Sequence, residues 1–102
     1  MEVVERLVED KAVVIFSKST CGMSHAVKTL ISSFGANPTV YEVDELPEGH
    51  QLEKALLSQR KVSSFPVVYI GQQLVGGEAE LMSLHVKAQL VPLLKNAGAI
   101  WI

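Results

Sequence analysis

The sequence predicts a single α/β domain in which a mixed four-stranded sheet is flanked by helices. A chain of 102 residues suits one domain, with 48% hydrophobic and 20% charged residues, a composition typical of a packed core. Apolar segments switch repeatedly between the period of a strand and that of a helix. A strand–helix–strand unit makes one strand pair parallel, whereas a later tight turn makes another pair antiparallel, so the sheet is mixed.

The first half of the chain alternates helix, strand, helix, strand. Residues 2–9 form a helical stripe of valine and leucine with charged residues opposite. Residues 12–16 (AVVIF) are a continuous run of β-branched and aromatic type, which is typical of a strand buried on both faces. After Cys21, apolar residues recur at helical spacing until Gly35 provides a stop. Residues 39–43 (TVYEV) then alternate as a second strand.

The second half predicts a helix, a hairpin and further helix. A helix is expected over residues 48–59. Pro66 opens a strand at 67–70, because the first position of a strand tolerates a missing N–H. A turn leads directly to a short antiparallel partner at 74–75, and residues 78–96 are expected to be helical.

Glycine and proline residues mark two boundaries in this second half, and the complete order of helices and strands matches a known fold. Gly76 and Gly77 break the last strand, while Pro92 kinks or divides the final helix or begins a new short one. A mixed sheet with helices on both faces, in this order, is the plan of the thioredoxin fold.

Composition also excludes several classes of function. The net charge of −2 offers no basic footprint, so we expect no direct binding of nucleic acid. No apolar run approaches the roughly 20 residues that span a bilayer, so no membrane association is expected. Residues 1–10 lack the features of a signal peptide. A single cysteine excludes an internal disulfide and favours an intracellular reducing compartment.

That cysteine, Cys21, lies between the predicted buried strand and the following helix. Unpaired N–H groups, the helix dipole and the neighbouring Lys18 all favour a thiolate there, so we expect the pKa of the thiol to be lowered. The alternative is that Cys21 is only a small buried apolar residue. Its setting among serine, threonine, lysine and glycine favours a reactive thiol.

Three landmarks in order resemble the glutaredoxin family over nearly the whole chain. They are the segment FSKSTCGMS around Cys21, then Ser64-Phe65-Pro66, then Gly76-Gly77. The segments VVIFSKSTC and TLISSFGANPTVYEVDE, Met23-Ser24-His25, Met82-Ser83-Leu84-His85 and the ending Ala97 to Ile102 resemble the land-plant class III glutaredoxins most closely. These are also called CC-type or ROXY proteins. Gly22 departs from the second cysteine of that class, and Ala99-Ile100-Trp101-Ile102 departs from its common ending Ala-Leu-Trp-Leu.

The resemblance implies a glutathione-dependent thiol–disulfide oxidoreductase, with residues 1–102 as one glutaredoxin domain. Cys21 would be the catalytic thiol. Since Ser24 stands where dithiol relatives keep a second cysteine, the cycle needs an external thiol, glutathione, and its substrates are glutathionylated or thiol proteins. We expect low activity, because Glu53, Ser63 and Glu80 replace a common glutamine, a basic residue and an aspartate.

The resemblance also implies a set of glutathione contacts. A carboxylate would meet Lys18, and Phe65 would pair its backbone with the ligand. Pro66 is expected to follow a cis peptide bond, although an ordinary strand-opening proline is the alternative. The full set of expected glutathione-binding residues is Lys18, Phe65, Pro66, Gly77, Ala79 and Glu80.

Two other uses of the chain stay open. The tetrapeptide Cys21-Gly22-Met23-Ser24 approaches the site of monothiol iron–sulfur glutaredoxins, in which one cysteine and one glutathione per subunit ligate a [2Fe–2S] cluster in a dimer. Apart from Cys21 in that role, no metal ligand is expected. His25 and His85 are each a single histidine on a helix and are expected to be surface or packing residues, and His50 is expected in a polar turn with no ligand spacing to any partner.

The second open use is a regulatory adaptor that docks through the C-terminal tail. In CC-type proteins, a Leu-x-x-Leu-Leu stretch and the terminal motif bind TGA-type basic-leucine-zipper transcription factors, which implies a location in the cytoplasm and nucleus. The alternative is that Trp101 and its neighbours fold back onto the core. The expected partner-binding residues are Leu90, Leu93, Leu94, Ala99, Ile100, Trp101 and Ile102.

Overall fold

Four strands form one mixed sheet, as predicted. The structure is a computed structural model that describes residues 2–20, 22–60 and 62–100. The strands are β1 (Val13–Ser17), β2 (Thr39–Glu42), β3 (Val67–Ile70) and β4 (Gln73–Gly76), in the order β2-β1-β3-β4. The central strand β1 pairs in parallel with β2 and antiparallel with β3, and β3 forms the antiparallel hairpin with β4. Relative to the predictions, β1 lies one residue later and β2 stops one residue earlier. The strand β4 begins one residue earlier than predicted and continues through Gly76, which was expected to break it.

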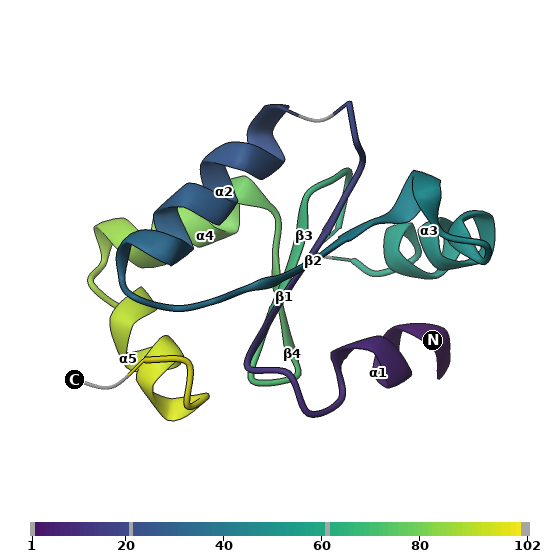
Figure 1. The fold of residues 1–102 in the computed structure, drawn as a ribbon. Helices are drawn as coiled ribbons and strands as arrows, with labels where there is room; N and C mark the ends of the chain where they lie inside the picture. Colours follow the sequence, from purple (N-terminus) through teal and green to yellow (C-terminus); the bar gives the residue numbers. More distant parts are fainter. Residues whose placement is uncertain (1, 21, 61, 101–102) are drawn as a thin grey trace.

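Helices cover both faces of this sheet (Figure 1). One face carries α1 (Glu2–Val8) and α3 (Gly49–Leu57); the other carries α2 (Gly22–Ser33), α4 (Glu78–Val86) and α5 (Leu90–Asn96). A short 3₁₀ turn, η1 (Val43–Glu45), follows β2 and replaces the last predicted residue of that strand. These layers confirm the thioredoxin fold expected from the order of elements.

Alternation along β1 feeds two separate cores. All five residues of β1 are buried, and successive side chains of a strand point to opposite faces. Val13 and Ile15 therefore pack on the side of α2, α4 and α5, whereas Val14 and Phe16 pack on the side of α1 and α3. The prediction of a strand buried on both faces is confirmed.

The C-terminal helical region is divided before Pro92, and not at it. The helix α4 ends at Val86, and the chain turns through Ala88, whose φ is 59°. Pro92 lies in the first turn of α5, where its missing N–H has no partner within the helix to lose. Of the three roles predicted for this proline, beginning a new short helix is the one confirmed. His85, near the end of α4, is exposed, and its ring lies edge-on to Phe34 at 5.6 Å between centroids.

The tail folds back onto the protein itself. Leu90, Leu94 and Ile100 are buried at 1%, 0% and 7% exposure in the core beneath α2 and α4. Leu93 and Ala99 pack on the same core and stay partly exposed. This packing favours the alternative that the tail is structural, because three of the side chains expected to contact a partner are covered by the chain. Trp101 and Ile102 lie outside the described residues.

No helix within the described ranges is long and apolar enough to cross a membrane.

Candidate functional site

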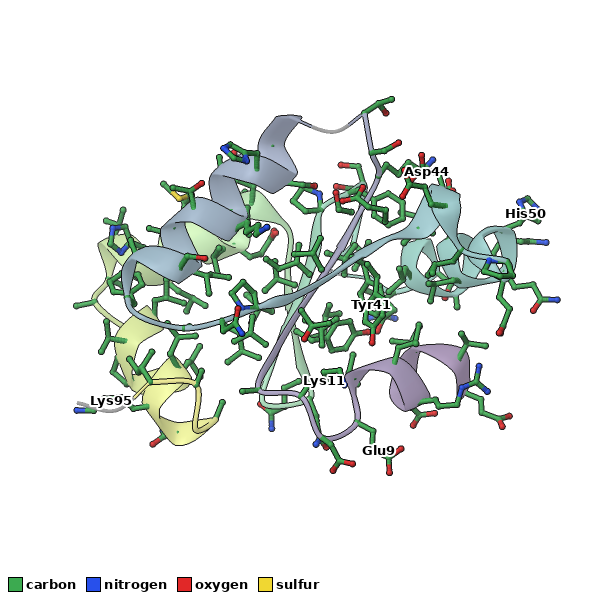
Figure 2. The ribbon with its side chains drawn as sticks, in the orientation of Figure 1. Glu9, Lys11, Tyr41, Asp44, His50 and Lys95 are labelled. Atoms are coloured by element: carbon green, nitrogen blue, oxygen red, sulfur yellow. The ribbon has the colours of Figure 1, made fainter. Side chains whose placement is uncertain are left out.

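The parallel pairing of β1 and β2 brings the polar loops that follow these two strands to the same end of the sheet. Ser17 and Glu42, the last residues of these strands, are register partners, so the residues that follow each strand are neighbours. Asp44 in η1 lies at this end of the sheet (Figure 2) and accepts hydrogen bonds from the Ser19 backbone N–H at 3.0 Å and from the Ser19 hydroxyl. These two bonds lower the pKa of Asp44 below its ordinary value of 3.8. Asp44 therefore holds the segment that leads to the predicted nucleophile; Cys21 itself lies outside the described residues.

Sequence reasoning missed Asp44. Its partner Ser19 is 25 positions away, so no local motif links the two. The available signal was the strand–helix–strand pattern, since parallel strands end at the same edge of a sheet.

Lys18 is already engaged within the protein. Its Nζ lies 3.0 Å from Glu53 Oε2 of α3, and the two side chains are 36% and 32% exposed. The same Nζ lies 5.5 Å from the centroid of the Phe65 ring. The cation expected to meet a ligand carboxylate thus stands beside Phe65, but it is shared with an acidic side chain.

Phe65, Pro66 and Gly77 form a second, closely packed part of the site. The Phe65–Pro66 peptide bond is cis, as predicted. Gly77, directly before α4, lies so close that a Cβ there would be 3.3 Å from the Pro66 carbonyl oxygen, which explains why glycine suits this position. The Gly77 N–H donates to Glu80 Oε1 at 2.8 Å. Glu80 therefore caps the helix it belongs to.

A hollow of about 170 Å³ joins these residues at the N-terminus of α4. Five of the six predicted glutathione contacts line it; the sixth, Lys18, does not, although its Nζ lies 5.5 Å from the centroid of the Phe65 ring. A helix N-terminus favours an anionic group, so the hollow suits the anionic end of a ligand. Four further lining residues, Met23, Ser63, Ser64 and Glu78, were not among the predicted contacts, although Ser64 belongs to the Ser64-Phe65-Pro66 landmark. The complete lining is Met23, Ser63, Ser64, Phe65, Pro66, Gly77, Glu78, Ala79 and Glu80.

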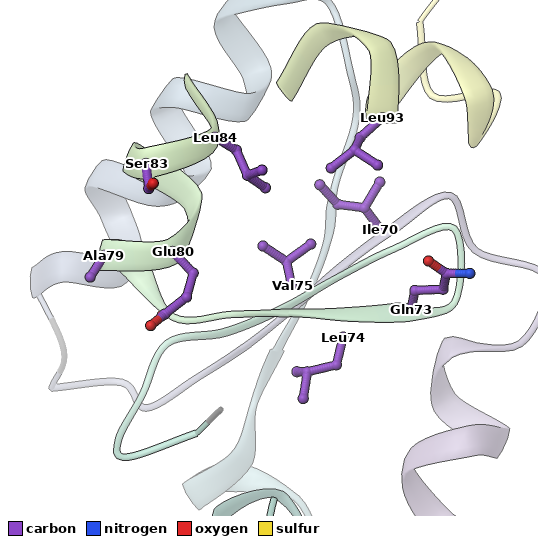
Figure 3. Close-up of a pocket in the computed structure, with 9 residues that line it drawn as sticks. All are labelled: Ile70, Gln73, Leu74, Val75, Ala79, Glu80, Ser83, Leu84 and Leu93. Carbon is purple, nitrogen blue, oxygen red and sulfur yellow. The ribbon is translucent and has the colours of Figure 1, made fainter. Parts of the chain in front are cut away.

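A second, larger hollow lies beside the hairpin of β3 and β4. It measures about 500 Å³ and lies between β4, α4 and α5, where Leu93 faces Ile70 and Val75 (Figure 3). Leu93 is the residue of the predicted docking stretch that reaches this surface. Histidines take no part in either hollow, and the described part of the chain has no group of three or more histidine, cysteine, aspartate or glutamate side chains placed to hold a metal ion.

Known proteins share both the sequence pattern and the fold of this chain. The sequence model of the glutaredoxin family matches residues 13–75. Among curated proteins, the chain is 56% identical to monothiol glutaredoxin-S1 of Arabidopsis thaliana over 102 residues and 50% identical to glutaredoxin-C1 of Oryza sativa subsp. japonica over 103, with all of each chain covered. Among solved structures, a buckwheat glutaredoxin–glutathione complex superposes with a TM-score of 0.92 at 34% identity, covering 98% of this chain and 91% of that one. The holo form of glutaredoxin C1 from Populus tremula x tremuloides gives 0.88 at 36% identity, covering 97% and 89%.

Proposed function

The chain belongs to the glutaredoxin family, and we propose that it is a monothiol enzyme that reduces glutathione mixed disulfides with Cys21 as its nucleophile. Family membership supports glutathione-dependent thiol oxidoreductase activity in general. The finer proposal depends chiefly on the hollow that gathers Phe65, Pro66, Gly77, Ala79 and Glu80 at the start of α4. The buckwheat relative solved as a glutathione complex supports glutathione as the ligand here.

Binding would use both sides of this hollow. Phe65 and Pro66 form one wall and the first turn of α4 the other, so the peptide backbone of glutathione would lie between them. The N-terminus of α4 would attract the carboxylate at the γ-glutamyl end. Lys18, beside the Phe65 ring, would attract the glycyl carboxylate at the other end.

The reaction would proceed by two thiol–disulfide exchanges. The Cys21 thiolate attacks the glutathione sulfur of a glutathionylated protein, which forms the Cys21–glutathione disulfide and releases the protein thiolate. The thiolate of a second glutathione attacks the sulfur of the bound glutathione, which releases glutathione disulfide and restores the Cys21 thiolate. Because Ser24 cannot supply a second protein thiol, the second exchange needs a thiol from outside the chain.

A steady-state deglutathionylation assay tests this proposal. We expect Cys21→Ser to abolish turnover of a glutathionylated peptide, because a hydroxyl at neutral pH is not a thiolate. Ser32→Ala, an exposed change on α2 away from the hollow, is the control and should match the wild type. Equal rates for Cys21→Ser and the wild type would disprove the enzymatic proposal.

The adaptor function remains a second candidate because of Leu93. Its side chain lines the 500 Å³ hollow with Leu74, Val75 and Leu84, so part of the Leu-x-x-Leu-Leu stretch is open to a partner. The occupant that the CC-type resemblance implies is a TGA-type transcription factor, and a location in the cytoplasm and nucleus is part of the same proposal.

A binding titration with a purified TGA-type protein tests the adaptor candidate. We expect Leu93→Ser to weaken binding, whereas Val86→Ser should not, because Val86 is 81% exposed and lies outside the hollow. Circular dichroism checks that both variants stay folded. Unchanged binding by a folded Leu93→Ser protein would exclude this hollow as the docking site.

The [2Fe–2S] dimer is a further use of the same thiol. Its four thiolates would come from Cys21 and one glutathione of each subunit. An ultraviolet–visible spectrum after anaerobic reconstitution with glutathione tests it, and a spectrum without visible cluster absorption would exclude it.

A further inference from the structure

A third hollow lies on the opposite side of α2 from the glutathione groove. It has a volume of about 230 Å³ and lies between β2, at the edge of the sheet, and the first two turns of α2. This volume is below the roughly 300–1,000 Å³ typical of pockets for drug-sized ligands, so an occupant would be small. The lining residues are Ser17, Lys18, Ser19, Ser24, His25, Lys28, Val40 and Glu42.

Two buried polar atoms in this hollow have no hydrogen-bond partner. Ser24 is only 7% exposed, and its Oγ has no partner within the described ranges. The same holds for Glu42 Oε2, which faces α2 from β2. Buried polar atoms are nearly always satisfied in folded proteins, because leaving one unpaired costs about 1–3 kcal/mol. Both atoms therefore indicate a polar occupant of the hollow.

Side chains of opposite charge line the hollow without forming an ion pair. Glu42 supplies a carboxylate from β2, and Lys28 supplies an ammonium from α2. The ion pairs of the described residues are Arg6–Glu48 and Lys18–Glu53, so Lys28 and Glu42 are not joined by one. An occupant between them would need a cationic donor for Glu42 and an anionic group for Lys28.

The other polar groups of the hollow also favour an anionic group on the side of α2. His25 and the first turn of α2 lie on the same side as Lys28, and a helix N-terminus favours an anion. The hydroxyls of Ser17 and Ser19 donate to the Lys18 carbonyl and to Asp44, so they are already used within the protein. Ser24 is thus the hydroxyl of this hollow that still needs a partner.

We propose that this hollow binds an α-amino-acid group, with its ammonium on Glu42 and its carboxylate on Lys28. The Ser24 hydroxyl donates to the same carboxylate. Apart from Lys18, which is paired with Glu53, the site shares no residue with the glutathione groove, and it does not depend on the thiol chemistry proposed above. Two sources carry this group, namely a free amino acid and the γ-glutamyl end of a second glutathione, separate from the one placed in the groove at the N-terminus of α4.

An NMR titration of the full-length, reduced protein tests the site. The probes are L-glutamate, S-methylglutathione, acetate and methylammonium, with ionic strength held constant by sodium chloride. We expect saturable amide shifts at Ser24, Lys28 and Glu42 with L-glutamate, with S-methylglutathione, or with both. Shifts there with glutamate alone assign a free amino acid, and shifts there with S-methylglutathione alone assign the γ-glutamyl group. Acetate and methylammonium should each bind about tenfold more weakly or worse, since each makes half of the charged hydrogen bonds.

Two variants complete the test. Glu42→Gln should weaken binding at the hollow by about tenfold or more, because it removes the acceptor for the ammonium. Glu45→Gln changes an exposed acid outside the hollow and should leave the affinity unchanged. The proposal is overturned if neither probe shifts these amides, if the shifts are confined to the groove of Phe65 and Gly77, if acetate binds as well as glutamate, or if folded Glu42→Gln binds like the wild type.

Discussion

Replacing Glu53 by glutamine should tighten glutathione binding, because it frees the cation that the ligand needs. In the wild type, Lys18 Nζ is 3.0 Å from Glu53 Oε2. A ligand carboxylate must displace this partner, and it must then remain close to a second negative charge. Glutamine keeps the size of the side chain but removes both obstacles.

The magnitude follows from the exposure of the pair. With the two side chains about one-third exposed, their interaction is a surface pair worth at most about 1 kcal/mol. Repulsion between two carboxylates about 4 Å apart adds about 1 kcal/mol in a water-like dielectric. A gain of about 1–2 kcal/mol lowers the KM for a glutathionylated peptide by about fivefold to thirtyfold. The kcat should stay constant, because ground state and transition state gain equally.

Steady-state kinetics at low and high salt provide the assay. The matched control is Glu48→Gln, which breaks the exposed Arg6–Glu48 pair of 3.3 Å far from the hollow and should leave KM unchanged. Because salt screens surface charges, the advantage of Glu53→Gln should shrink at high ionic strength. A KM that stays the same or rises in Glu53→Gln would refute the argument, since it would mean that Glu53 does not compete for Lys18.

Three further changes test other parts of the structure. The pKa of Asp44 is lowered in the folded protein, so the stabilisation from its hydrogen bonds to Ser19 is present above pH 3.8 and is lost as pH falls through the folded pKa. The difference in stability between wild type and Asp44→Asn, measured by thermal melts, should therefore vanish in acid. Ile100→Ala should cost about 2–4 kcal/mol in urea denaturation if the tail is part of the core, and a loss below about 0.5 kcal/mol would show that it is not. Gly76→Ala should destabilise the fold by more than about 1 kcal/mol, because φ is +125° and the new Cβ would lie 2.8 Å from Glu80 Cγ; an unchanged urea midpoint would contradict this.

The fold was predictable because its signals are local. The apolar run before Cys21, the helical spacing after it and the turn at Gly71 each follow from neighbouring residues. The errors arose where tertiary packing decides a boundary. The last helical region divides at Ala88, which carries no breaker signal, and the visible breaker Pro92 is tolerated inside the next first turn.

The site was predictable as a set of residues, but its internal bonds were not. Motifs placed Phe65, Pro66 and Gly77 together, and the structure brings them to one hollow. The bond from Asp44 to Ser19 spans 25 positions and depends on the parallel pairing of two strands. The burial of Ile100 likewise depends on a chain reversal after α5, so the apolar character of the tail suited docking and folding back equally well.

These internal bonds also explain how low activity would arise. Both charged side chains expected to contact glutathione are occupied: Lys18 pairs with Glu53, and Glu80 accepts from the Gly77 N–H. Binding therefore exchanges one set of polar interactions for another, and such exchanges contribute little net free energy. The penalty is carried equally by the bound substrate and the transition state, so it raises KM and leaves kcat unchanged. A thiol with weakened nucleophilicity would instead lower kcat. A high KM with normal kcat, corrected by Glu53→Gln, would therefore identify a groove that satisfies its own charges as the cause.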